Sequence, residues 1–186
     1  MPANVIAALV FIINAVAQLY LFVLLLRLLL PWLGADFRNP IAQAIMRITS
    51  PVVVPLRRII PPIGKVDTAT VLVAVILQYL TILVVLMIYG VSAGFADIAI
   101  TTVVNLVLLT VRLFVFAIII RVILSWISPG GYNPAIALIQ TMTDRILQPF
   151  RRIIPPMGGL DLSPLFAIIL LTALTIIIAG LKPLAI

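Results

Sequence analysis

The chain has 186 residues, of which 65% are hydrophobic and 9% are charged, whereas a soluble domain carries about 25% charged residues. It contains no cysteine, no histidine and only five carboxylates, which excludes the usual metal and haem ligands and predicts a membrane protein that has no cofactor and is not an enzyme. The net charge of +7 comes from basic residues beside apolar runs, which favours contacts with anionic lipid headgroups over contacts with nucleic acid.

Four apolar runs are long enough to cross a bilayer, which takes about 20 mostly apolar residues per helix. They cover residues 5–30, 68–90, 98–127 and 163–181. Because lipid offers no hydrogen-bond partner to the backbone, we expect each run to be a helix. The predicted fold is therefore an all-α membrane protein with four transmembrane helices.

The segment between the first two runs is predicted to be a short amphipathic helix in the membrane interface. Its apolar stripe consists of Ile41, Ile45, Ile48 and Val52. Asn39 before Pro40 is suited to cap this helix, and Pro51 and Pro55 are expected to end it early. The corresponding residues of the second linking segment are Asn133, Pro134 and Pro149.

The two halves of the sequence repeat each other when the chain is shifted by 94 residues. Residues 27–67 and 121–161 share 16 identities in 41 positions without a gap. The identities include Arg, Trp, Asn, Pro and Asp, so shared apolar composition does not explain the match. We therefore predict two domains, residues 1–93 and 94–186, each built as helix, interfacial segment and helix. Since each domain contains two spans, both enter the membrane in the same direction, as parallel repeats.

Basic residues predict how the spans are oriented. The two long loops carry most of them, namely Arg38, Arg47, Arg57, Arg58, Lys65, Arg145, Arg151 and Arg152. The short link 91–97 carries none. The positive-inside rule therefore places both long loops in the cytoplasm and both termini outside.

One hexapeptide, Arg-Arg-Ile-Ile-Pro-Pro, occurs at residues 57–62 and again at residues 151–156. The prolines cannot continue a helix, so each arginine pair is expected at headgroup depth. The candidate contacts to anionic lipid or to a partner protein are Arg57, Arg58, Lys65, Arg151 and Arg152. The alternative is that these residues only fix the orientation of the chain.

Four polar residues are predicted to lie deep in the membrane: Asn14, Gln18, Gln78 and Arg112. A charge near the bilayer centre costs about 3 kcal/mol or more, so Arg112 is expected to face protein or water. This polar level is interpreted either as a helix–helix or subunit contact in a homo-oligomer, or as a midplane site on a pathway.

Two arginine–aspartate pairs are predicted to pin the two hairpins. Arg27 and Arg121 each end a span on the cytoplasmic side, while Asp67 and Asp161 each begin the next span on that side. We expect the structural pairs Arg27–Asp67 and Arg121–Asp161.

The chain resembles the YggT family, also called YlmG, in its two-repeat proteobacterial form. The residues that carry the resemblance are Arg121–Trp126, Ser128–Pro134, Pro149–Pro156 and Gly158–Pro164, with a looser match at Asn39–Pro40, Pro55–Pro62 and Gly64. The resemblance implies a multi-pass protein of the bacterial inner membrane, with links to osmotic or potassium tolerance and to cell division.

Two functions follow as hypotheses. The first is an inner-membrane scaffold or assembly factor, which oligomerises and holds a basic cytoplasmic face against anionic lipid or a partner protein. The alternative is a small channel or transporter in osmotic or potassium homeostasis, with the polar level of Asn14, Gln18, Gln78 and Arg112 as its pathway.

Overall fold

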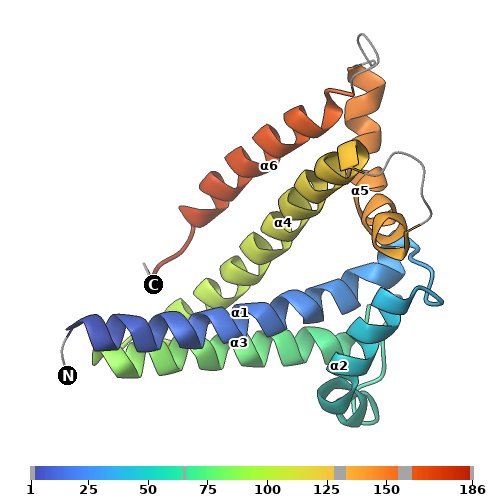
Figure 1. Cartoon of the computed structure of the whole chain (residues 1–186). Helices are drawn as coiled ribbons and strands as arrows, with labels where there is room; N and C mark the ends of the chain where they lie inside the picture. The colour runs from blue at the N-terminus through green and yellow to red at the C-terminus, as the bar shows by residue number, and fades with distance from the viewer. Residues whose placement is uncertain (1–2, 65, 128–132, 155–160, 185–186) are drawn as a thin grey trace.

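The structure is a computed structural model that describes residues 3–64, 66–127, 133–154 and 161–184. The fold of these residues is all-helical (Figure 1). The helices are α1 (Ala3–Leu33), α2 (Pro40–Arg57), α3 (Thr68–Tyr89), α4 (Phe95–Ile127), α5 (Pro134–Ile153) and α6 (Ser163–Ala179). The all-α class expected from the sequence is confirmed.

Three helices are long and apolar enough to cross a membrane, namely α1, α3 and α4. The fourth expected span, at 163–181, corresponds to α6, which is apolar but only 17 residues long. At about 1.5 Å per residue α6 measures roughly 26 Å, slightly less than the ~30 Å of a typical hydrocarbon core. The count of four transmembrane helices therefore stays a prediction.

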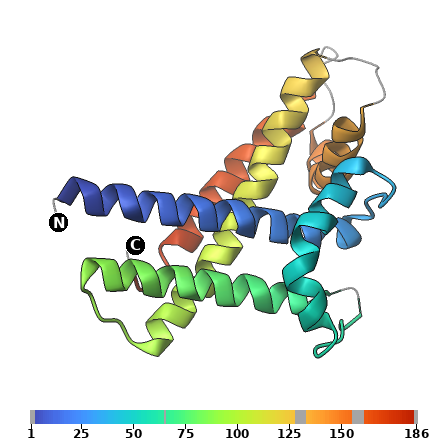
Figure 2. The same ribbon diagram turned by 60° about the horizontal axis from the view of Figure 1, so that its bottom comes forward.

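Four of the helices form two pairs, α1 with α3 and α4 with α6. The link between the pairs begins where Gly90, with a φ of 65°, ends α3 in a left-handed conformation. Figures 1 and 2 show the pairs meeting near this link and diverging toward α2 and α5. Both chain ends lie away from α2 and α5 (Figure 1).

Each half has its own apolar core, and a third cluster joins the halves. In the first half, Val53 of α2 packs with Leu21 and Leu24 of α1 and with the start of α3. In the second half, Leu147 of α5 packs with Ile118 and Ala167. The joining cluster contains Leu25, Leu30, Ala35, Ala42, Ile45, Leu113, Leu138 and Met142. The linking helices therefore connect each pair of spans and also connect the two halves.

The prediction that prolines end the linking helices early is wrong. Pro51 and Pro55 lie inside α2, and Pro149 lies inside α5. All three are on the exposed side of their helix. A proline has no N–H, so the carbonyl four residues earlier loses its helical hydrogen bond. For all three prolines this carbonyl lies on the same exposed side of the helix, where polar surroundings can satisfy it.

The buried side of α2 also differs slightly from the expected stripe. Ile45 is buried as expected, but the other buried positions are Ala42, Thr49 and Val53. Ile48 and Val52 are exposed. The helix thus turns a narrow apolar side to the spans and leaves further apolar side chains outside, next to the exposed Arg47.

Candidate functional site

Arg27 is the most deeply buried charge in the described part of the chain. Its side chain is 2% exposed, and one guanidinium nitrogen donates to the hydroxyl of Thr49 at 2.8 Å. The Thr49 hydroxyl itself donates to the carbonyl of Ile45 at 2.7 Å. The Nε atom of Arg27 lies 3.6 Å from Asp67, whose side chain is 12% exposed. The structure thus brings together the expected pair and adds Thr49, which ties α2 to it.

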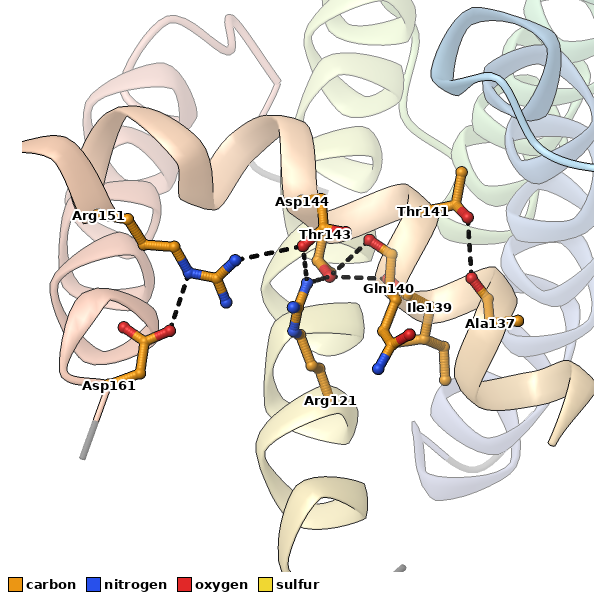
Figure 3. A network of polar contacts seen from close by, with 9 residues as sticks. All are labelled: Arg121, Ala137, Ile139, Gln140, Thr141, Thr143, Asp144, Arg151 and Asp161. Carbon is orange, nitrogen blue, oxygen red and sulfur yellow. Dashed lines mark hydrogen bonds and ion pairs between the residues drawn. The ribbon is translucent and has the colours of Figure 1, made fainter. Parts of the chain in front are cut away.

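The second half repeats the contact to threonine, but its arginine does not contact the aspartate that precedes the next helix. Arg121 donates to the Thr143 hydroxyl at 2.7 Å and to the Asp144 carboxylate at 2.6 Å. Asp161, the expected partner, lies 2.9 Å from Nε of Arg151 instead (Figure 3). The expected Arg121–Asp161 pair is therefore corrected to Arg121–Asp144.

A single difference between the halves explains the changed partner. The position of Asp144 is occupied in the first half by Ser50, 94 residues earlier. Ser50 offers Arg27 only a hydroxyl, at 3.3 Å. A carboxylate at this position attracts the guanidinium more strongly, because the attraction of opposite charges adds to the hydrogen bond. Arg121 therefore stays with Asp144, and Asp161 is left to Arg151.

The two arginines of each repeated pair have different surroundings. The first arginine contacts the carboxylate before the next span: Arg57 lies 4.0 Å from Asp67, and Arg151 lies 2.9 Å from Asp161. The second arginine, Arg58 or Arg152, is exposed and forms no ion pair with the described residues. The first arginine of each pair thus joins the two ends of its own hairpin, and the second leaves its positive charge exposed at the surface. Lys65, the fifth expected contact, lies outside the described residues.

Asp161 is held in its ionised form by its neighbours. Burial acts to raise the pKa of this carboxyl, but hydrogen bonds from Ser163 and Arg151 outweigh burial and bring the pKa below its usual value. The backbone nitrogen of Ser163 donates to the carboxylate at 3.0 Å. Asp161 therefore joins the end of α5 to the start of α6 at neutral pH.

Contacts between α2 and the start of α5 join the two halves at the basic end. The Asn39 side chain accepts from the nitrogen of Ile41 at 2.9 Å, which caps α2, and donates to the carbonyl of Pro134 at 2.7 Å. Arg145 of α5 donates to the carbonyl of Trp32 at the end of α1. Asn133 caps α5 through the nitrogen of Ala135 at 2.8 Å. The capping positions expected from the sequence thus also lie at the seam between the halves.

The four polar residues expected deep in the membrane line one cavity of about 210 Å³. The structure adds two polar residues to its wall, so that the polar lining is Asn14, Gln18, Gln78, Asn105, Arg112 and Lys182. Asn105 precedes Arg112 by seven residues, two helical turns, which is the spacing that could have indicated a shared face. Lys182 gives no such signal, because it follows α6 and reaches the cavity only through the tertiary fold.

The described residues offer no evident metal site. They contain no group of three or more acidic side chains that could hold a metal ion. The two candidate sites are thus the basic end at α2 and α5, and the cavity between the spans.

Comparison with known proteins finds matches over most of the chain. The family model described as CCB3/YggT matches residues 6–88 and again residues 100–182. An uncharacterised protein of Pseudomonas aeruginosa is 40% identical over 173 residues, which is 92% of this chain and 88% of the relative. The protein YggT of Escherichia coli K12 is 37% identical over 164 residues, 88% of this chain and 85% of the relative. The chloroplastic YlmG homolog protein 2 of Arabidopsis thaliana is 41% identical over 61 residues, which cover 31% of this chain and 23% of the relative. No solved structure matches.

Proposed function

Because the chain belongs to the CCB3/YggT family, we propose that it is a multi-pass inner-membrane protein that acts as a scaffold or assembly factor. It would act through a basic cytoplasmic face that contacts anionic lipid headgroups. The basic face consists of Arg58 and Arg152, together with the ends of α2 and α5 that carry them. We further propose four spans in two parallel repeats, with both termini outside.

The observation that carries this proposal is that the two arginines of each pair differ in their contacts. Arg57 and Arg151 lie beside carboxylates of their own hairpin, whereas Arg58 and Arg152 point their charge to the surface. The two exposed arginines occupy equivalent positions of the two halves, and neither forms an ion pair with the described residues. The exposed arginines therefore support a contact outside the chain.

Apolar side chains beside the exposed arginines favour lipid as the contacting surface. Ile59 follows Arg58 and is 78% exposed, and Ile153 follows Arg152 and is 79% exposed. A basic residue next to an exposed apolar one is suited to the membrane interface, where the charge meets phosphates and the apolar group meets acyl chains. An acidic partner protein is the other surface that such a face would fit.

Self-association is the second part of the proposal. Gln18 and Arg112 lie near the middle of α1 and α4, and both are exposed in the single chain. Polar groups at this depth are costly in contact with acyl chains. A second copy covering the open side of the cavity would shield them, which supports a homo-oligomer as the working unit.

Replacing Arg58 and Arg152 with glutamine is expected to weaken retention of phosphatidylglycerol by up to about 30-fold. Each basic residue near an anionic surface contributes about 1 kcal/mol, and about 1.4 kcal/mol corresponds to a factor of ten. Native mass spectrometry of the protein released from mixed phosphatidylglycerol and phosphatidylethanolamine nanodiscs measures both the retained lipid and the number of chains per particle.

The matched control is the double variant Arg38→Gln with Arg47→Gln, which removes the same charge from exposed positions of the first long loop. It should retain phosphatidylglycerol like the unchanged protein. Equal losses in the two double variants would show that net charge alone attracts lipid. Unchanged retention in both would leave the arginine pairs as orientation signals and contradict the proposed contact.

A small channel or transporter remains the second candidate, and the cavity is the observation that favours it. The cavity lies between α1, α3 and α4 and is lined by polar side chains. A potassium ion there would face the positive charges of Arg112 and Lys182, which is unfavourable. A flux assay in liposomes distinguishes this candidate from a scaffold, which would give no flux.

A further inference from the structure

The polar groups that line the cavity between the helices are either positively charged or neutral. Arg112 and Lys182 contribute two positive groups, and the neutral polar groups are the carboxamides of Asn14, Gln18, Gln78 and Asn105. Within the described ranges no carboxylate lines the cavity, and neither cation forms an ion pair within 4 Å. Among the described residues, the walls of this cavity therefore carry positive charge with no carboxylate beside it.

The cavity lies near the middle of α1, α3 and α4, at the depth where such charge is most costly in a membrane. Arg112 is 17 residues from the first residue of α4 and 15 from its last, Phe95 and Ile127. Gln78 is likewise central in α3. A single charge near the middle of a membrane is costly, and two like charges around one cavity add their mutual repulsion. A bound negative charge would lower both costs.

Helix packing alone does not explain the positive charge. The residue equivalent to Arg112 in the first half is Gln18, 94 residues earlier, and it lines the same cavity. A neutral amide thus occupies this helix position in one half without any charge. Arg112 carries a positive charge that Gln18 lacks. This difference indicates a function for the charge itself.

The donors of the cavity suit an anion. A guanidinium offers five N–H donors and an ammonium three, and neither accepts a hydrogen bond; each carboxamide adds two more N–H donors. Hydrogen bonds that involve an ionised group are about twice as strong as neutral ones, and an anion adds charge attraction to the two cations. From this geometry we propose that the cavity is a binding site for a small soluble anion, held between Arg112 and Lys182.

The size of the cavity limits what the anion can be. Its volume of about 210 Å³ is well above the roughly 10–15 Å³ that one water needs. Chloride, acetate or inorganic phosphate fits with a few waters. The proposal commits to a free anion, and the test separates it from a lipid phosphate whose chains would lie outside the cavity.

The test measures thermal unfolding of the full chain in neutral phosphatidylcholine nanodiscs, followed by the fluorescence of its two tryptophans. Sodium chloride, acetate and phosphate are each titrated against sodium gluconate at constant ionic strength. At least one of the three should raise the unfolding temperature in a saturable way, because a ligand that binds only the folded state stabilises that state. In Lys182→Gln the concentration for half of this effect should rise at least tenfold.

Lys182 follows α6 and is outside the helices, so its change tests the site without altering a span. Arg112→Gln should give the same loss, and Arg112→Lys should retain part of the effect. The control Arg47→Gln removes the same charge from an exposed position of α2 and should behave like the unchanged protein.

Three results would overturn the proposal. The first is the absence of a saturable effect with all three anions. The second is an equal loss in Arg47→Gln and Lys182→Gln, which would reduce the effect to net charge. The third is stabilisation that needs Arg112 but arises only from phosphatidylglycerol in the nanodisc, which would assign the site to a lipid phosphate.

Discussion

Replacing Arg27 with methionine is expected to lower the free energy of unfolding by about 3–5 kcal/mol, the cost of breaking a buried ion pair by removing one partner. The change leaves Asp67, 12% exposed, without the cation that lies 3.6 Å from it. Arg57, the other nearby cation, is 4.0 Å away and is itself 45% exposed. It cannot replace a buried guanidinium, so the first hairpin loses its closure at α2.

The sequence repeat provides the matched control for this variant. Arg121→Met should cost only about 1–2 kcal/mol, because Asp144 is 48% exposed and can be solvated, and Asp161 keeps its contact with Arg151. Adding Asp67→Asn to Arg27→Met should recover part of the loss, since the remaining group is then neutral. Unfolding titrations with sodium dodecyl sulfate in mixed micelles measure all three. Equal costs for the two arginines would contradict the difference in burial.

Leu147→Ala is expected to lower the free energy of unfolding by about 2–5 kcal/mol, the range for truncating a buried leucine. Leu147 is fully buried against Ile118 of α4 and Ala167 of α6. It is therefore the apolar anchor by which α5 is fixed to both spans of its half. The truncated side chain leaves a space that neighbouring helices fill only partly, so α5 should also become more accessible to proteolysis.

The control for this change lies on the same helix. Ile153 is 79% exposed, and Ile153→Ala should change the unfolding free energy by no more than about 0.5 kcal/mol, as for surface substitutions in general. The same micelle titration applies to both variants, and limited proteolysis reports on α5 separately. If both alanine variants were equally stable, α5 would not be anchored through Leu147.

Periodicity and composition were sufficient to predict the helices. α3 begins at Thr68 and α6 at Ser163, as the apolar runs predicted, and the all-helical class follows from the need to satisfy the backbone in lipid. Whether the prolines of α2 and α5 end these helices could not be predicted in the same way. Whether Pro51 ends a helix depends on whether the freed carbonyl faces the core or the outside, and that is decided by tertiary packing.

The ionic contacts could be predicted from the sequence only in part. The repeat predicted one pair for each half, but the Ser50 to Asp144 difference changed the partner of Arg121. The depth of the polar residues could be counted along each span, and the structure places Asn14, Gln18, Gln78 and Arg112 around one cavity. Lys182 could not be found by counting, because its place there depends on where α6 ends relative to α4.

Both basic ends, at α2 and α5, are expected to face the cytoplasm, and cysteine labelling tests this orientation most directly. The chain contains no cysteine, so a single introduced thiol reports its own side of the membrane. Ile63→Cys and Ile153→Cys lie at exposed positions after α2 and at the end of α5, and Ser92→Cys lies in the link between α3 and α4. In intact cells, a membrane-impermeant maleimide should label only the thiol at position 92, and inside-out vesicles should reverse the pattern. Labelling of position 63 or 153 in intact cells, or labelling of position 92 only in inside-out vesicles, would contradict this orientation.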